Sequence, residues 1–251
     1  MGTSLFGRKE KKGLVCMGKR EQALAYLERD PLRMMDMLEP VRRNMVEITT
    51  CGEEGVLLYV PTAELYLLAA DSAEAARSLC AGVEKMNLAA AHSQETADFL
   101  REKYGIKNRD RCTQAVYLGK EPLPVPEGFE IRQLGEESFQ VISENYTTVS
   151  DPKYIHQRLA AGVMHGAVEN GELMGFIGIH DEGSVGLLKV LPDYRRRGVA
   201  TALMAYMTNW CLERGWVPFS QIFEGNVAST ELHKKMGWTL CSQDMYWVMD
   251  D

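Results

Sequence analysis

The stretch of sequence that decides the fold is Val190-Leu191-Pro192-Asp193-Tyr194-Arg195-Arg196-Arg197-Gly198-Val199-Ala200-Thr201. Apolar residues 185–191 predict a strand, Pro192 and Asp193 predict a turn, and the apolar periodicity of residues 199–212 predicts a helix. The first amides of a helix have no partner inside the helix, and the helix dipole makes that end positive. A strand, a basic turn that contains glycine and a helix therefore predict a site that binds phosphate groups.

Length and composition are those of an ordinary globular protein. The chain has 251 residues, enough for one large domain or two modest ones, with 45% hydrophobic and 25% charged residues. The net charge of -7 argues against a general nucleic-acid-binding protein, because such proteins are usually basic. No apolar run is long enough to cross a bilayer, and residues 1–12 lack the apolar core of a signal peptide. We therefore expect a cytoplasmic protein that binds neither nucleic acid nor membrane.

The cysteine pattern predicts no metal site. The cysteines form no CxxC pair and no cysteine–histidine pair at zinc-binding spacing. We expect reduced thiols, several of them in the core, and no metal cofactor. The six residues are Cys16, Cys51, Cys80, Cys112, Cys211 and Cys241.

A proline-rich segment divides the chain. Residues 121–128 contain three prolines and a glycine, which disfavour helix and interior strand, so they are predicted to be a linker. We expect an N-terminal α/β domain at residues 1–120 and a second α/β domain with a mixed sheet at residues 129–251. Both parts end in the order strand, helix, strand, helix, strand. A degenerate internal repeat and a chance similarity both remain open, and only the second part has the arginine-rich turn.

Hydrophobic periodicity and capping residues locate the individual elements. Asn170-Gly171 predicts a tight hairpin turn. In the first part, the predicted helices are 19–28, 31–43, 73–85 and 94–104, and the predicted strands are 55–60, 64–69, 87–91 and 112–118. In the second part, the predicted strands are 129–133, 165–169, 173–179, 184–191, 217–223 and 238–247, and the predicted helices are 136–149, one that begins near 151, 199–214 and 228–236.

A second motif follows the predicted strand 217–223. Asn226 can cap the helix that starts there, and Gly237 can end that helix in a left-handed conformation. Taken alone, this motif predicts only a helix with well-defined ends. It becomes specific in combination with the arginine-rich turn.

The two motifs together resemble the GNAT superfamily of acyl-CoA-dependent N-acyltransferases. The family's first signature, Gln/Arg-x-x-Gly-x-Gly/Ala, is matched at Arg195, Gly198 and Ala200. The resemblance covers the chain from Phe129 to its C-terminus, and the proline-linked N-terminal half looks most like the glycine N-acyltransferase-like branch. The family's later element is matched by Asn226, Ser229 and the ending His233-Lys234-Lys235-Met236-Gly237-Trp238.

The resemblance implies a twisted mixed sheet flanked by helices, with acetyl-CoA or another acyl-CoA as co-substrate. The amides of residues 196–201 would hold its diphosphate, and Arg195 and Arg196 would add positive charge. The pantetheine arm would pair with the backbone of residues 188–190 like an added strand. The implied donor-binding residues are Leu188, Lys189, Val190, Arg195, Arg196, Arg197, Gly198, Val199, Ala200, Thr201, Asn226 and Ser229.

Attack of an amine on a thioester needs a base, a donor for the developing oxyanion and an acid for the leaving thiolate. The implied oxyanion donor is the amide of Val190. The candidate bases are Glu182, just before one predicted strand, and Glu224, at the end of another, with His180 as a further candidate. The alternative for each carboxylate is a solvated turn residue, and for His180 a hydrogen-bonded histidine at a strand edge.

The acid is less clearly indicated. The family often has a tyrosine at the position of His233, so this chain departs from the pattern. His233 can donate or accept a proton near neutrality, and a non-chemical role for it is equally open. Tyr246 and Tyr194 are the other candidates, with Tyr194 ranked last.

We therefore expect an N-acyltransferase that transfers acetyl as its first-choice acyl group to a small-molecule or peptide amine. Transfer would be direct, within a ternary complex, because no cysteine occupies a motif position. The alternative is a catalytically inactive CoA-binding regulatory or scaffold module, motivated by the missing tyrosine. A homodimer and a monomer both remain open.

Overall fold

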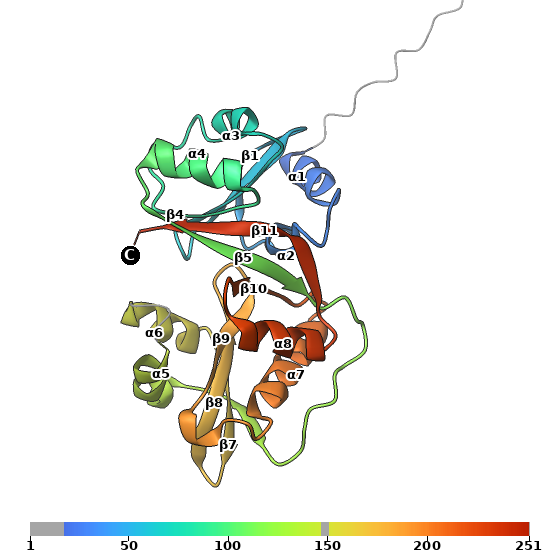
Figure 1. The fold of residues 1–251 in the computed structure, drawn as a ribbon, viewed down its shortest axis with the longest axis vertical. Helices are drawn as coiled ribbons and strands as arrows, with labels where there is room; N and C mark the ends of the chain where they lie inside the picture. The colour runs from blue at the N-terminus through green and yellow to red at the C-terminus, as the bar shows by residue number, and fades with distance from the viewer. Residues whose placement is uncertain (1–17, 147–150, 251) are drawn as a thin grey trace, which may run out of the picture.

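The computed structural model describes residues 18–146 and 151–250. The segment 1–12, Cys16 and the end of the predicted helix 136–149 lie outside these ranges. The chain forms two lobes, and the long strands β5 (Asn108–Val116) and β11 (Thr239–Met249) lie between them (Figure 1).

The upper lobe is built on a seven-stranded sheet with the order β1-β2-β3-β4-β11-β5-β10. Successive side chains of a strand point to opposite faces, and both faces of this sheet are covered. Val56, Leu58 and Val60 pack against α1 (Lys19–Leu27) and α2 (Met35–Arg42), whereas Leu57 packs against α3 (Ala73–Leu79) and α4 (Gln94–Tyr104). The remaining strands are β1 (Glu47–Gly52), β2 (Gly55–Val60), β3 (Leu65–Ala70), β4 (Leu88–Ala91) and β10 (Phe219–Phe223).

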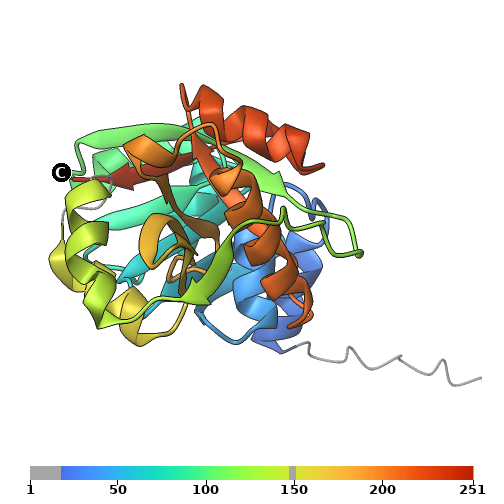
Figure 2. The ribbon, with the colours of Figure 1, turned by 90° about the horizontal axis from the view of Figure 1, so that it is seen from below.

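The lower lobe is built on a four-stranded antiparallel sheet with the order β6-β7-β8-β9. Helix α7 (Val199–Leu212) covers one face, and α5 (Phe139–Asn145) and α6 (Pro152–Ala160) cover the other (Figure 2). Helix α8 (Val227–Lys235) lies beside β11. The strands are β6 (Glu130–Gln133), β7 (Met164–Glu169), β8 (Glu172–Ile179) and β9 (Val185–Val190).

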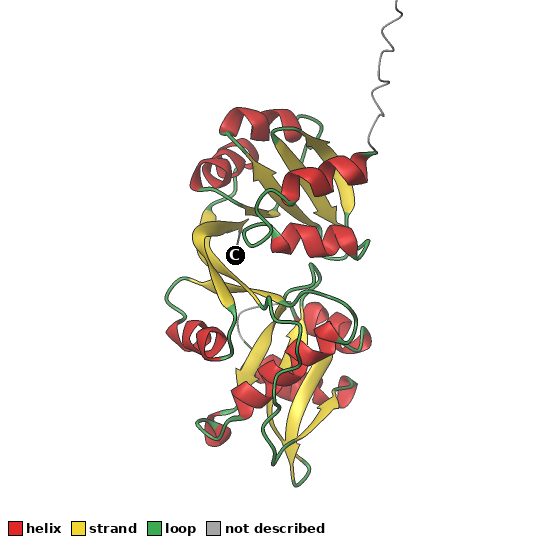
Figure 3. Ribbon diagram, turned by 90° about the vertical axis from the view of Figure 1, so that its right-hand side faces the viewer, coloured by secondary structure: helices red, strands yellow, loops and turns green. Residues whose placement is uncertain are grey.

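The two halves of the chain exchange their last strands. The order β3-α3-β4-α4-β5 in the first half matches β9-α7-β10-α8-β11 in the second, as the internal-repeat hypothesis requires. Strand β5 pairs with β10, with Val116 opposite Phe219, and β11 pairs with β4, with Tyr246 opposite Ala91. The large sheet therefore contains strands from both sides of the linker. The side view shows both lobes joined through this sheet (Figure 3). Division into two domains at the linker stays a prediction.

Several element ends differ from the predictions. Strand β1 was not predicted, because its sequence Glu-Ile-Thr-Thr-Cys-Gly is polar and belongs to an edge strand. Helix α3 ends at Leu79 instead of residue 85, shortly before Gly82, a poor helix former. Helix α2 begins four residues later than predicted, at Met35 instead of Pro31, and strand β5 begins four residues earlier, at Asn108 instead of Cys112.

Two expectations, reduced cysteine thiols and no membrane-spanning segment, can be compared with the described residues. Within them, the cysteines are free thiols: Cys51, Cys80, Cys112, Cys211 and Cys241. The helices in the described part of the chain are too short or too polar to span a membrane.

Candidate functional site

A cleft of about 1860 Å³ lies where the two sheets meet. The Ser220 hydroxyl of β10 donates a hydrogen bond to the carbonyl of Val185 in β9 at 2.8 Å, which holds the starts of these strands together. The two strands belong to different sheets. They therefore leave an opening that helices α7 and α8 also line, through Ala200 and Ser229 among others.

Strand β9 contains a bulge on the cleft side. Its pairing with β8 shifts between Lys189, opposite Phe176, and Gly186, opposite Gly178, so β9 has one extra residue. Leu187 takes up the distortion with a positive φ of 54°, a rare value for a side chain of this kind. Leu187 and Leu188 both line the cleft.

The backbone of Val190 points away from β8. Leu191 donates its amide to the carbonyl of Met174 at 2.9 Å, and Val190 lies opposite Gly175. Hydrogen-bonded and non-hydrogen-bonded pairs alternate in an antiparallel ladder, so the amide of Val190 faces away from β8. Val190 lines the cleft, which makes this amide an available donor on that side. This geometry fits the expectation from the family resemblance.

The turn before α7 exposes backbone amides at the helix start. Arg196 and Gly198 have positive φ values of 60° and 89°, and the helix begins without a side-chain cap. A side chain at Gly198 would meet no atom within 4 Å, so the backbone conformation, not crowding, favours glycine here. The first-turn amides and the helix dipole make this a suitable place for a diphosphate.

The three arginines of this turn are not equivalent. Arg197 donates to both carboxylate oxygens of Glu169 at 2.9 and 2.8 Å, so its charge is largely neutralised in place. Arg195 and Arg196 are exposed and form no ion pair within the described residues. Tyr194 donates to Glu172 at 2.7 Å on this outer surface, which removes it as a proton donor in the cleft.

Helix α8 lines the other side of the opening. Asn226 caps it as predicted, with Oδ1 accepting from the amide of Ser229 at 3.1 Å. His233 is 1% exposed, and its Nδ1 lies 2.8 Å from the carbonyl of Ser229. Its ring meets Trp238 edge to face, and its Nε2 is buried with no partner in the described part of the chain.

These contacts fix the chemistry of His233. Because a carbonyl only accepts, Nδ1 carries the proton and Nε2 presents a lone pair. Burial lowers the pKa of His233, so the ring is neutral near neutral pH. A neutral ring in this tautomer accepts a hydrogen bond at Nε2 and has no proton to give there. This geometry favours the non-chemical role that the sequence left open.

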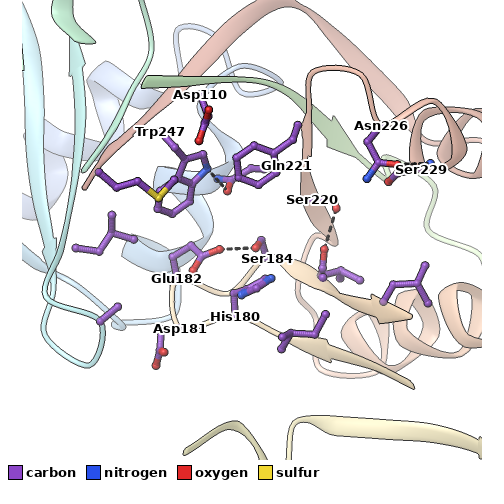
Figure 4. A pocket seen from close by; sticks show the side chains of 18 of the residues that line it. Asp110, His180, Asp181, Glu182, Ser184, Ser220, Gln221, Asn226, Ser229 and Trp247 are labelled. Carbon is purple, nitrogen blue, oxygen red and sulfur yellow. Dashed lines mark hydrogen bonds between the residues drawn. The ribbon is translucent and has the colours of Figure 1, made fainter. Parts of the chain in front are cut away.

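The loop between β8 and β9 brings together a second group of titratable side chains. Glu182 is 5% exposed, lines the cleft and accepts a hydrogen bond from the Ser184 hydroxyl. In the close view these two side chains lie on the side of the cleft that faces Trp247 (Figure 4). Asp181 points away from Trp247 and pairs with Arg158 of α6 at 2.5 Å.

His180 lies in the same loop, and its ring is already hydrogen-bonded to a tyrosine. The Tyr154 hydroxyl is 2.5 Å from His180 Nδ1, and burial raises the pKa of Tyr154, which keeps this hydroxyl protonated. Tyr154 is therefore the donor, and the Nδ1 lone pair is occupied. Burial also lowers the pKa of His180. These contacts match the alternative of a hydrogen-bonded edge histidine better than a free base.

The remaining candidates are less well placed. Glu224 lines the cleft but is exposed and forms an ion pair with Arg111 of β5. Tyr246 packs among the apolar side chains beneath α3 and α4, with Phe99 and Leu100, and the Arg109 guanidinium lies 5.2 Å from its ring centre. Tyr246 also lines the cleft, and Glu224 differs from Glu182 because its carboxylate is held by an arginine.

One wall of the cleft combines a residue from each half of the chain, a pairing that the sequence did not predict. Asp110 of β5 lies directly opposite Trp247 of β11 in the antiparallel register, and both line the cleft. Trp247 donates its indole N–H to Gln221 of β10 at 3.1 Å. The available signal was the run of charged residues at 109–111, at the start of β5, but the predicted strand began at Cys112.

Within the described residues, no group of three or more histidine, cysteine, aspartate or glutamate side chains is close enough together to hold a metal ion. The absence of a metal cofactor stays an expectation.

Comparison with known proteins places this cleft in a known fold. Residues 129–238, under half of the chain, match the family model described as the acetyltransferase (GNAT) family. A search of curated proteins finds no match.

Solved structures resemble most of the chain. A Drosophila protein has 19% sequence identity and a TM-score of 0.61, covering 78% of this chain and 74% of that chain. A GCN5-related N-acetyltransferase-like protein from Streptococcus suis has 17% identity and a TM-score of 0.55, covering 90% and 99%. A GCN5-related N-acetyltransferase from Kribbella flavida has 14% identity and a TM-score of 0.54, covering 88% and 96%. The predicted fold, a twisted mixed sheet flanked by helices, is confirmed as a GNAT fold.

Proposed function

From the GNAT-family domain at residues 129–238 and the geometry of its cleft, we propose that the chain is an acyl-CoA-dependent N-acyltransferase that transfers acetyl to a primary amine. One observation carries the proposal. Helix α7, which begins uncapped after Gly198 and lines the cleft from Ala200, and the bulged strand β9 border a single opening between two sheets. Along this opening, the start of α7 can bind phosphate groups, and the free backbone edge of β9 can pair with the rest of the ligand.

The described residues fit an acyl-CoA. The amides of residues 196–201 and the free guanidinium groups of Arg195 and Arg196 would hold the diphosphate. The backbone of residues 188–190 would pair with the pantetheine amides, and Asn226 and Ser229 flank the opposite side. When bound, the acyl-CoA supplies the activated thioester carbonyl.

The amide of Val190 is the proposed oxyanion donor, because it faces away from β8 in a wall of the cleft. A fixed backbone donor of this kind stabilises charge that develops in the transition state without reorganising. This role needs no particular side chain at position 190.

Glu182 is the proposed general base. Ser184 holds one carboxylate oxygen through its hydroxyl, and the other oxygen accepts no hydrogen bond within the described residues. A buried, oriented carboxylate can take the proton from the attacking ammonium directly or through one water.

Water is the proposed proton source for the departing sulfur. His233 carries no proton on Nε2 near neutral pH. A free thiol has a pKa of about 8.5, so its thiolate needs only a weak acid. The described cysteines do not line the cleft, which supports direct transfer without an acyl-enzyme.

Calorimetry with acetyl-CoA tests the donor site. Arg196→Glu with Gly198→Asp puts two negative charges beside the diphosphate, and we expect affinity to fall about 100-fold or more. The matched control is Lys85→Glu with Gly82→Asp, the same change of charge in an exposed loop of the other lobe, which should leave affinity unchanged. Equal affinity for both double variants would contradict the assigned site.

Release of free thiol from acetyl-CoA tests turnover. We expect release with at least one member of a panel of cationic, neutral and amino-acid amines. Binding of acetyl-CoA without thiol release on any amine would favour the non-catalytic module, an alternative to which the comparisons lend no support.

A further inference from the structure

The two ends of the cleft differ in charge. At the donor end, Ala200 of α7 lines the cleft, and the exposed Arg195 and Arg196 lie outside the lining, in the turn before this positive helix start. Carboxylates line the rest of the cleft from both halves of the chain. They include Glu64, Asp110 and Asp250 from the upper lobe and Asp181 and Glu182 from the β8–β9 loop.

The cationic side chains in this lining are already paired. Among the described residues they are Arg109 and Arg111. Arg109 pairs with Asp98 at 2.5 Å, and Arg111 pairs with Glu224 and also with Asp244. They flank Asp110 in β5, and side chains alternate along a strand, so both arginines point to the face opposite that of Asp110.

Asp110 and Trp247 form a potential cation-binding pair in this wall. Residues directly opposite in an antiparallel ladder project on the same face, so the exposed carboxylate lies beside the indole ring. The hydrogen bond from Trp247 to Gln221 fixes the orientation of the ring. An ammonium group is attracted both by a carboxylate and by the face of an indole. Asp110 forms no ion pair within the described residues.

Glu182 lies on the other side of the same cleft, across from Trp247 (Figure 4). The charges of Glu182 and Arg43 interact, and the Arg43 guanidinium donates to the carbonyl of Gly183 at 3.5 Å and lies 3.6 Å from the centre of the Trp216 ring. Arg43 forms no ion pair with Glu182 in the described chain. Carboxylates without ion-pair partners therefore face one cavity from both of its walls.

We infer that the amine acceptor is an aliphatic diamine or polyamine, with its reacting nitrogen at Glu182 and a second ammonium at Asp110 and Trp247. This inference rests on the proposed N-acyltransferase function. An amino acid such as glycine would bring a carboxylate into a cavity lined by carboxylates, whose arginines are already paired. The cleft therefore disfavours amino-acid acceptors, in contrast to the glycine N-acyltransferase-like branch suggested by the sequence.

The transfer step balances without a further reactant. Glu182 takes one proton from the ammonium, and the nitrogen lone pair forms a bond to the thioester carbonyl carbon. The carbon–sulfur bond breaks, its electron pair leaves with sulfur, and the thiolate takes a proton from water. Loss of the second nitrogen proton gives a neutral amide, free CoA thiol and, overall, one released proton. The second ammonium is unchanged and serves only for binding.

Thiol release from acetyl-CoA with putrescine, butylamine and glycine tests this inference. A charge-assisted contact contributes roughly tenfold or more, so kcat/KM for putrescine should exceed that for butylamine by about that factor. Asp110→Asn should remove this advantage by raising KM for putrescine about tenfold, with kcat and all butylamine constants unchanged. Glu84→Gln, which removes one carboxylate from an exposed loop outside the cleft, is the matched control and should change neither.

The outcomes separate the two proposals. Faster reaction of glycine or butylamine, or an equal loss in Asp110→Asn and Glu84→Gln, would overturn the diamine inference and leave the acyltransferase function standing. Absence of thiol release with all three amines and with spermidine would overturn both.

Discussion

Glu182 and Glu224 differ in the surroundings of their carboxylates. Glu182 is buried in the cleft beside Ser184, and Glu224 is exposed and paired with Arg111. A carboxylate held by an arginine is a poor acceptor for a substrate proton, so the two side chains should not contribute equally.

Glu182→Gln should lower kcat by about 10²–10⁴-fold, the usual contribution of a general base. It retains the shape of the side chain, so acetyl-CoA affinity measured by calorimetry should stay the same. Glu224→Gln is the matched control and should change kcat far less. Similar losses in both variants, or none in Glu182→Gln, would remove Glu182 from the role of base.

His233→Phe separates a binding role from a proton-donating role. The variant loses the acceptor Nε2 but keeps a ring against Trp238, so we expect acetyl-CoA affinity to fall roughly fivefold, the value of one hydrogen bond. Turnover at saturating donor should stay within about twofold of the wild type. A large fall in kcat with unchanged donor affinity, measured by steady-state kinetics, would restore His233 as the acid.

At the scale of single residues, the sequence identified candidate catalytic residues but could not rank them. It placed Glu182, Glu224 and His233 near strand ends or on a helix, and all three do line the cleft. Their differences come from contacts with residues far away in sequence, such as Arg111 with Glu224. The pair of Asp110 and Trp247 was missed because only strand pairing makes these residues neighbours.

At the scale of single elements, the start of α7 was predicted to the residue. Gly198 precedes the helix in a left-handed conformation, and the apolar periodicity begins at Val199. The bulge in β9 was not predicted: Gly186 precedes Leu187 in the sequence, but the distortion depends on pairing with β8. Patterns of neighbouring residues therefore predicted the turn before α7 but not the bulge in β9.

A buried ion pair joins three elements of the upper lobe. His92, before α4, has Nε2 2.9 Å from Asp36 of α2 and Nδ1 3.1 Å from the carbonyl of Leu68 in β3. Both neighbours accept, so both ring nitrogens carry protons. Burial alone lowers the pKa of His92, but the charge and hydrogen bond of Asp36 together with the Leu68 carbonyl outweigh burial and nearby Arg33, and raise it.

This raised pKa predicts the sign of a pH effect. A histidine whose pKa is higher in the folded state stabilises the fold fully below its unfolded pKa of about 6.5, and the contribution is lost as pH rises through the folded pKa. As pH rises above about 6.5, Asp36→Asn should therefore lose less stability than the wild type, measured by thermal unfolding. Parallel Tm curves for the two proteins would contradict a charged His92.

At the scale of the whole molecule, the exchanged strands make the two halves interdependent. Strand β5 lies between β10 and β11, so a sheet of the second half is incomplete without a strand from the first. The linker is also attached to the lower lobe, because Leu123 exchanges two backbone hydrogen bonds with the Asn209 side chain of α7, at 2.7 and 2.8 Å. Sequence patterns could predict the linker but not the exchange, which depends on long-range pairing.

Cleavage at an engineered protease site in the exposed Glu127-Gly128 segment tests this interdependence. The two fragments should stay associated and elute together in size-exclusion chromatography, separating only in denaturant. Separate elution of folded fragments in buffer would contradict the shared sheet and support two independent domains.

The central claim is that the start of α7 holds the diphosphate of an acyl-CoA and directs its thioester along β9. A crystal structure with acetyl-CoA tests it most directly. We predict the diphosphate within hydrogen-bonding distance of the amides of residues 196–201 and the thioester carbonyl near the amide of Val190. A diphosphate bound elsewhere, or no bound acetyl-CoA, would contradict this account.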